Sequence, residues 1–232
     1  MSRPRFSCPM TKAETVFGWI FLFLQQLLII PVAWLLEKAG IHLSTAWLNI
    51  VFFVMNFLII AVGMQKFLRT DLRHFGKHFL YCLGIATVGF AVYWAANMLV
   101  SIAIVLYWPE FTNANDANLA AMSKECYWVF LACTVFLVPI TEEVLFRGIL
   151  FGSVHKYSPV VAYIFSAMIF SAIHVVPYLG SDGFTLKTAL VSMIQYLPPS
   201  LCLAWVYEKS GTIFVPALVH CAVNLIGVLA MR

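Results

Sequence analysis

Residues 129–154 read VFLACTVFLVPITEEVLFRGILFGSV, an apolar run with three charged residues near its middle. A helix needs about 20 apolar residues to cross a lipid bilayer, and this run is long enough. Its charged members are Glu142, Glu143 and Arg147. A charge at membrane depth costs roughly 2.5–3.5 kcal/mol on insertion scales, so these three side chains need partners or a function.

The rest of the chain has the composition of an integral membrane protein. Of its 232 residues, 62% are hydrophobic and 10% are charged, whereas soluble domains are about 45–50% apolar and about 25% charged. The apolar runs are continuous, whereas strands of a transmembrane barrel alternate polar and apolar residues. We therefore expect an all-α, polytopic bundle of transmembrane helices that forms a single domain over residues 1–232.

Seven apolar runs are candidates for membrane spans, and we expect the functional residues on the last four. The expected spans lie at about 16–36, 46–65, 79–107, 125–153, 158–178, 187–207 and 212–230. Pro139 is expected to kink the fourth span, because proline removes a helical hydrogen bond. The polar stretch 109–124 is interpreted as a loop outside the membrane.

Basic residues predict how the bundle is oriented. One side collects Arg3, Arg5, Lys12, Lys66, Arg69, Arg73, Lys77, Arg147, Lys156 and Lys209, and the other has Lys38, Lys124, Lys187 and Arg232. Because cytoplasmic loops are enriched in Lys and Arg, this distribution places the N-terminus in the cytoplasm. The net charge of +4 is scattered over loops and does not indicate nucleic-acid binding.

The helical spacing of the charged residues in the fourth span predicts different roles for them. Glu143 and Arg147 are four residues apart, so their side chains share a helix face and can pair. Glu142 points about 100° away from Glu143. A carboxylate without a cationic partner in an apolar pocket can act as a general base.

Two later spans supply polar partners at compatible depths. Glu142 and His174 lie on either side of a turn near Tyr157, and at 1.5 Å per residue each is roughly 22–26 Å from it. His220 and Asn224 are four apart and share a face of the last span. Taken singly, a Glu–Arg pair is more often a structural ion pair, and a histidine in a helix more often packs against its neighbours. A single asparagine more often makes contacts between helices. Their presence in three helices at similar depth favours a common site.

These side chains are the parts of a water-activating amide hydrolase. A carboxylate beside an imidazole can take a proton from water and pass it to a leaving amine. A second imidazole and a carboxamide can donate hydrogen bonds to a tetrahedral oxyanion. Cys221 is an alternative nucleophile, but it points about 100° away from His220 on a helix, which disfavours a cysteine protease. The six cysteines form no CxxC pair, so a disulfide framework is not expected.

The motifs resemble the CPBP family of intramembrane proteases, which includes CAAX prenyl endopeptidases and bacteriocin-processing or self-immunity proteins. The family pattern is Glu-Glu-x-x-x-Arg, then Phe-x-x-x-His, then His-x-x-x-Asn. Here it stands as EEVLFR at 142–147, FSAIH at 170–174 and HCAVN at 220–224. The similarity covers about residues 125–230, which we take as the catalytic core.

The resemblance implies roles for the motif residues and a class of substrate. Glu142 would activate water with help from His174, while His220 and Asn224 would stabilise the oxyanion. The substrate would be a peptide or protein precursor in or at the lipid bilayer, and the short chain is typical of a member from a bacterial cytoplasmic membrane. No cofactor is expected, and no His-Glu-x-x-His helix is present. Two histidines and a glutamate that hold zinc remain the alternative.

Two other classes of function stay open at this stage. The first is a catalytically silent immunity or partner-binding protein on the same scaffold, against which the intact set of six motif residues argues. The second is a proton-coupled transporter, in which Glu and His carry protons. A transporter of that kind often has inverted repeats, and none is evident in the sequence. The sequence favours an endopeptidase.

Overall fold

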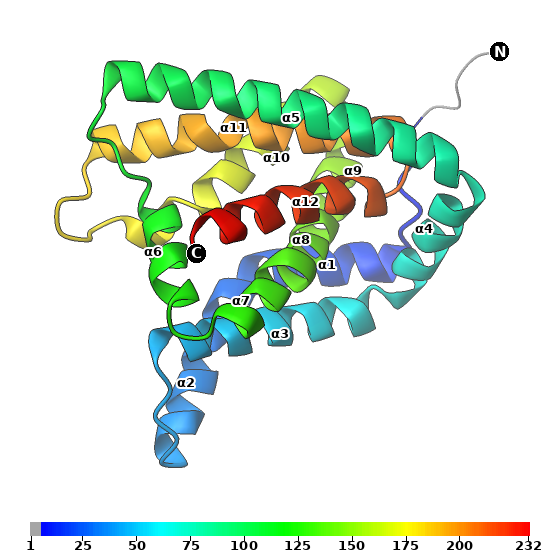
Figure 1. Ribbon diagram of the computed structural model, residues 1–232. Helices are drawn as coiled ribbons and strands as arrows, with labels where there is room; N and C mark the ends of the chain where they lie inside the picture. The colour runs from blue at the N-terminus through cyan, green and yellow to red at the C-terminus, as the bar shows by residue number, and fades with distance from the viewer. Residues whose placement is uncertain (1–5) are drawn as a thin grey trace.

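The structure, a computed structural model, describes residues 6–232 and confirms an all-α bundle (Figure 1). Its described residues contain no β-strand. In this part of the chain, five helices are long and apolar enough to cross a membrane, and a sixth span results if one bent pair is counted. The five comprise α3 (Thr45–Gly63), α5 (Phe79–Tyr107), the run Tyr127–His155, the run Pro159–Tyr178 that includes α10 (Pro159–Ile173), and α11 (Leu186–Ser210).

The first and last of the seven expected spans differ from expectation. The first is broken into α1 (Lys12–Leu24), a 3₁₀ turn η1 (Gln25–Leu27) and α2 (Ile29–Lys38), with a bend of 47°. The last, α12 (Phe214–Ala230), is apolar but has only 17 residues. A full crossing needs about 20, so α12 falls short of the usual length.

The fourth span changes helical type along its length. It consists in order of α7 (Tyr127–Ala132), the π-helix η2 (Cys133–Leu137), α8 (Val138–Glu143), the π-helix η3 (Val144–Phe151) and α9 (Gly152–His155). The distortion expected at Pro139 therefore takes the form of a π-helical segment just before the proline. Segments with π-helical bonding often occur at functional sites.

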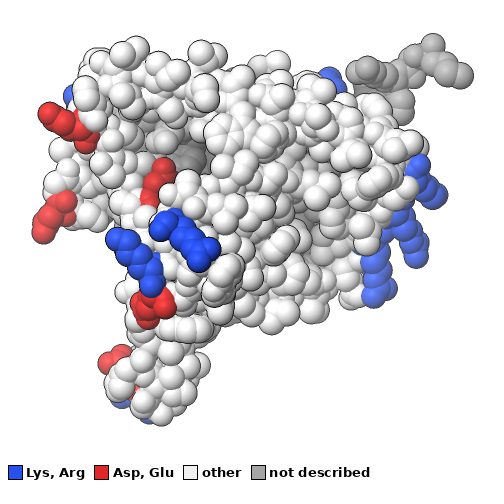
Figure 2. Space-filling view, viewed as in Figure 1, with Lys and Arg blue, Asp and Glu red and all other residues white. Residues whose placement is uncertain are grey.

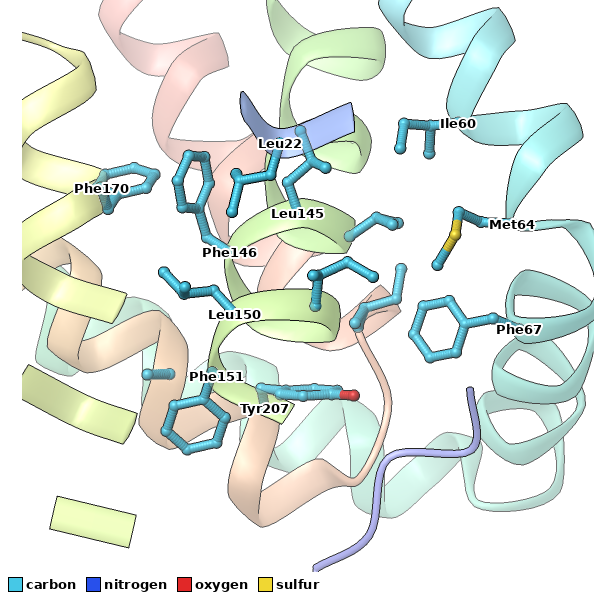
Figure 3. Close-up of a cluster of buried hydrophobic side chains, with 14 of the residues drawn as sticks. Leu22, Ile60, Met64, Phe67, Leu145, Phe146, Leu150, Phe151, Phe170 and Tyr207 are labelled. Carbon is cyan, nitrogen blue, oxygen red and sulfur yellow. The ribbon is translucent and has the colours of Figure 1, made fainter. Parts of the chain in front are cut away.

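The charged stretch lies in the most enclosed span of the bundle. In the most apolar window of the run Tyr127–His155, 56% of the residues are buried, against 17% in α5. Figure 3 shows Leu145, Phe146 and Leu150 of η3 at the centre of the largest apolar cluster, between Phe170 and Met64. The charged stretch is thus packed on several sides by other helices.

The two ends of the bundle carry different helices and charges. At one end α4 (Gln65–Lys77) has Lys and Arg side chains that gather along one edge of the molecule (Figures 1 and 2). At the opposite end α6 (Ala114–Ser123) runs between α5 and α7 (Figure 1). The stretch 109–124 was expected to be a loop, but ten of its residues form this helix because Asn113 caps its first turn through Asn115 and Asp116.

Candidate active site

Glu143 and Arg147 form the ion pair that their spacing predicts, in the fully buried part of the bundle. Arg147 Nη1 lies 3.1 Å from Glu143 Oε1, and both side chains are inaccessible to solvent. Arg147 Nη2 donates to the carbonyl and the hydroxyl of Ser200 on α11, at 3.1 Å each. The guanidinium also lies 4.6 Å from the centre of the Phe170 ring on α10. Arg147 therefore ties three helices together.

His220 of α12 lies between the two glutamates. Its Nδ1 is 2.9 Å from Glu143 Oε1, and its Nε2 is 3.8 Å from Glu142 Oε2. An ionised carboxylate can only accept hydrogen bonds, so the Nδ1 of His220 carries a proton. This bond fixes the orientation of the ring and directs Nε2 toward Glu142.

A π-helix and a proline leave one backbone carbonyl available for Asn224. In η2 the amide of Val138 bonds to the carbonyl of Cys133, five residues earlier. The next amide in this pattern would reach the carbonyl of Thr134, but it belongs to Pro139, which has no N–H. The Asn224 amide bonds there instead, with Nδ2 3.0 Å from the Thr134 oxygen. Its second N–H remains able to bind another acceptor.

His174 stands at the C-terminal end of α10 with its ring held on two sides. Its Nδ1 is 2.8 Å from the carbonyl oxygen of Phe170, so Nδ1 carries a proton and the neutral ring has its lone pair on Nε2. One face of the ring stacks on Tyr196 of α11, with centroids 4.4 Å apart. The imidazole is thus oriented with Nε2 as its proton acceptor.

The end helix α6 holds Tyr196 in place. Asn115 Nδ2 donates to the hydroxyl of Tyr196 at 3.1 Å, and that hydroxyl donates to Asp116 at 3.3 Å or Asn113 at 3.4 Å. Burial raises the pKa of Asp116 above its usual value, although the Tyr196 hydroxyl opposes the shift. The polar stretch that contains α6 therefore supports the Tyr196 ring, on which His174 stacks.

Glu142 lines a cavity of about 50 Å³. A single water needs only about 10–15 Å³ of this kind of volume, so the cavity has room for a nucleophilic water. Within residues 6–232, Glu142 Oε2 has no hydrogen-bond partner. The cavity walls come from four parts of the chain and are formed by Gln25, Gln26, Phe52, Phe53, Asn56, Val138, Thr141, Glu142, Phe146 and Ile173.

The structure brings four of the six predicted site residues into direct contact. Glu142, Glu143, Arg147 and His220 form one cluster. His174 and Asn224 are positioned by the backbone contacts described above. In the described part of the chain, neither is joined to Glu142 by a hydrogen bond or ion pair, although Ile173, next to His174, lines the Glu142 cavity.

Several residues of the site were not predicted from the sequence. Ser200 binds Arg147, Tyr196 stacks on His174, and the carbonyl of Thr134 holds Asn224. Gln25, Gln26 and Asn56 line the cavity from the first two expected spans. Their only signal in the sequence is polarity within an otherwise apolar run, which a search for catalytic motifs does not weigh.

The described side chains do not form the zinc site of the alternative mechanism. Among residues 6–232, no three His, Cys, Asp or Glu side chains converge so as to hold an ion. The Nδ1 atoms of His174 and His220 are held by a carbonyl and by Glu143, which leaves their Nε2 atoms as the possible ligands. A zinc site with two histidines and a glutamate would need these side chains to be rearranged.

Comparisons with known proteins show what the motif-bearing part of the chain is similar to. Residues 124–226, which contain all six motif residues, match the family described as type II CAAX prenyl endopeptidase Rce1-like. The chain is 26% identical over 184 residues to the UPF0177 protein YxdF of Lactococcus lactis subsp. lactis (strain IL1403), covering 77% of this chain and 92% of that protein. No solved structure matches. The family match over residues 124–226 confirms the resemblance drawn from the motifs.

Proposed function

We propose that this chain is an intramembrane endopeptidase in which Glu142 activates a water molecule to hydrolyse a peptide bond. One observation carries the proposal. Glu142 lines a cavity. Its Oε2 has no hydrogen-bond partner in residues 6–232 and lies 3.8 Å from Nε2 of His220. A carboxylate in this position can take a proton from a water held in the cavity.

In the proposed reaction, the water oxygen bonds to the carbonyl carbon while Glu142 takes one water proton. The carbonyl π bond opens to a tetrahedral oxyanion. In its doubly protonated form, His220 donates from Nε2 to this oxyanion, together with the second N–H of Asn224. The C–N bond then breaks, and the proton held by Glu142 passes to the leaving amine through Nε2 of His174.

Glu143 and Arg147 serve this chemistry by holding the helices. Glu143 orients His220 through Nδ1, and Arg147 neutralises Glu143 while it bonds to α11. Removing one partner of a buried ion pair leaves the other charge uncompensated. These two residues are therefore assigned to positioning, and Glu142 to the reaction.

The proposed substrate is a peptide or protein precursor associated with the membrane. The matched family is named for CAAX prenyl endopeptidases, so a prenylated peptide is the first substrate to test. The apolar helices place the protein itself in a lipid bilayer. A lipid-anchored precursor would reach a site inside this bundle without leaving the membrane.

We also propose that the end of the bundle with α4 faces the cytoplasm. Lys66, Arg69, Arg73 and Lys77 lie on α4, and cytoplasmic segments near membrane spans are enriched in such residues. Single cysteines at Asn115 and Lys156, in a variant without native cysteines, would be labelled with an impermeant maleimide on intact cells. Labelling of Asn115→Cys alone supports this orientation, and labelling of Lys156→Cys from outside contradicts it.

The function is tested with purified protein in lipid nanodiscs. The probes are an S-farnesylated CAAX peptide and a library of leader-peptide precursors, and the products are identified by mass spectrometry. The parent protein should cleave at least one peptide, Glu142→Gln should not, and a chelator should have little effect. One equivalent of zinc in active protein, with activity lost on stripping and restored on adding zinc back, would replace this mechanism by metal catalysis.

A further inference from the structure

Three amide side chains share the cavity with Glu142, and the proposed reaction uses none of them. Gln25 and Gln26 come from η1, and Asn56 comes from α3. Gln25 is 6% exposed and Asn56 is 3% exposed. Polar residues at membrane depth are unfavourable and usually mark contacts or functional pathways.

Asn56 is the clearest sign that this cavity takes a ligand. Its Oδ1 has no hydrogen-bond partner among residues 6–232, although it is buried. A buried acceptor left in this state costs roughly 1–3 kcal/mol. Most buried polar atoms in proteins are paired, so an unpaired amide in a residue that lines a cavity indicates a partner supplied from outside the chain.

The local structure places the glutamines in the cavity wall by breaking the first span. At η1 the amide of Leu28 bonds to the carbonyl of Gln25 at 3.3 Å, three residues back, and the chain bends by 47° there. Gly18 on α1 packs directly against Ile149 of η3, where a side chain on residue 18 would collide with Ile149. This close packing brings α1 against the span that carries Glu142.

The chemistry of the wall selects an uncharged ligand with both donors and acceptors. No Lys or Arg among residues 6–232 lines the cavity, so this wall is not built for an anion. Apart from Thr141 and Glu142, the other wall residues are aromatic or aliphatic, with Phe52, Phe53 and Phe146 among them. Side-chain amides both donate and accept, which matches the alternating N–H and C=O groups of a polypeptide backbone.

A substrate of an intramembrane protease needs hydrogen-bond partners for its backbone N–H and C=O groups. A helical segment satisfies its own backbone groups, but a peptide bond must be taken out of the helix before water can attack it. In a bilayer each backbone group left unpaired costs several kcal/mol. Amide side chains beside the reacting bond would pair with these groups and lower the energy needed to unwind the segment.

We infer that Gln25, Gln26 and Asn56 form a backbone-binding subsite that holds the unwound substrate segment in extended form beside Glu142. This inference deepens the proposed function and rests on it. It assigns a role to the first two expected spans, which lie outside the matched segment 124–226. The Oδ1 of Asn56 would accept a backbone N–H of the substrate.

The test removes the two partners of this hydrogen bond separately and together. The probe is a fluorescent S-farnesylated CAAX peptide, with a set of analogues in which an ester oxygen replaces one backbone N–H at a time. Binding is measured on Glu142→Gln protein in nanodiscs, so that no probe is consumed. Asn56→Leu is added to this background, and Asn49→Leu, on the same helix but outside the cavity, is the matched control.

One ester analogue should bind roughly five- to tenfold more weakly than the all-amide peptide when Asn56 is present. With Asn56→Leu this difference should disappear, while Asn49→Leu should keep it. Gln26→Leu is the second variant if Asn56→Leu fails to fold in a thermal melt, and it should likewise abolish the effect of one ester. Equal ester effects with and without these amides, or no binding of the probe, would overturn the inference.

The outcome also separates this inference from the proposed function. Coupling between an amide side chain and one ester position in a protein whose parent cleaves no peptide would support the subsite and reject the endopeptidase. Cleavage by the parent without such coupling would support the endopeptidase and reject the subsite.

Discussion

Two polar regions meet near Glu142, and they differ in how their hydrogen-bonding groups are satisfied. In the first region, Arg147 bonds to Glu143 and Ser200, and Glu143 also binds His220, although Glu143 Oε2 and Arg147 Nε remain unpaired. The second region is the wall that contains Asn56 and Glu142. In the described residues, Asn56 Oδ1 and Glu142 Oε2 have no hydrogen-bond partner, and both residues line the cavity.

The difference indicates that the residues of the first region stabilise the fold and that those of the second take part in the reaction or in binding. A buried group that is paired within the chain contributes to the fold, and its removal should be seen first in stability. A buried group that faces a cavity without a partner contributes little to the fold, and its removal should be seen in catalysis or binding. The adjacent residues Glu142 and Glu143 fall on opposite sides of this division.

The largest effect is expected for Glu142→Gln. The amide keeps the shape of the side chain but cannot take a proton from water, so the rate of peptide cleavage should fall by about 10²–10⁴. Because the only ion-pair partner of Glu142 within residues 6–232 is His220, at 3.8 Å, the melting temperature should change little. A comparison of cleavage rate and thermal melt in the same nanodisc preparation checks both. Loss of folding in this variant would show that Glu142 stabilises the fold, as the residues of the first region do.

Removal of Arg147 should affect stability first. Arg147→Ala leaves Glu143 buried without its charge partner and should destabilise the fold by roughly 3–5 kcal/mol. In a double-mutant cycle with Glu143→Gln, the second substitution should cost much less in the Arg147→Ala background than alone. An Arg147→Ala protein as stable as the parent but inactive would show that the guanidinium acts in the reaction.

Asp71 of α4 provides a reference carboxylate outside the spans. It accepts from Thr212 Oγ1 and from the amide of Ile213, each at 2.6 Å. Burial raises the pKa of Asp71 to about 6, although these hydrogen bonds oppose the shift. An unfolded Asp has a pKa of about 3.9, so the folded state binds the proton more tightly.

This pKa shift sets the sign of the pH dependence. The stabilising contribution is fully present below about pH 3.9 and is lost as the pH rises through about 6, by roughly 1–3 kcal/mol. Asp71→Asn should remove this step, so its stability relative to the parent should increase between pH 4 and pH 7. Thermal melts at the two pH values test this, and an unchanged difference would contradict the shift.

A smaller effect is expected at Pro139, which leaves the Thr134 carbonyl free for Asn224. Pro139→Ala restores an N–H that competes for this carbonyl, so kcat should fall roughly three- to tenfold, equivalent to about 0.6–1.4 kcal/mol. The same change should raise thermal stability, because proline is unfavourable inside a helix. Pro216→Ala, in the first turn of α12, is the matched control. An unchanged kcat in Pro139→Ala would show that the proline does not control the position of Asn224.

Part of this site could be predicted from spacing alone. The Glu143–Arg147 pair follows from four-residue spacing, and it is present even though a π-helix begins at Val144. The bond from Asn224 to Thr134 could not be predicted, because it depends on a π-helical register that a period of 3.6 residues does not reveal. The spacing also does not show that His220 lies between both glutamates.

The fold was predictable in class but not in detail. Long apolar runs identify the helices, because a bilayer leaves few other ways to satisfy the backbone. The break at Gln25 escaped prediction since the flanking residues remain apolar over a full span length. The helix α6 escaped because its polar composition is typical of a loop, while its stability comes from the Asn113 cap and from contacts with Tyr178 and Tyr196.

The most direct test measures kcat and KM for Glu142→Gln and Asn56→Leu on the same cleaved peptide, with Asn49→Leu as the control. The account predicts that Glu142→Gln lowers kcat by about 10²–10⁴ with little change in KM. It predicts that Asn56→Leu raises KM roughly five- to tenfold or lowers kcat/KM by that factor, while the protein folds as the parent does. Wild-type kcat in Glu142→Gln would contradict the central claim that Glu142 activates the water.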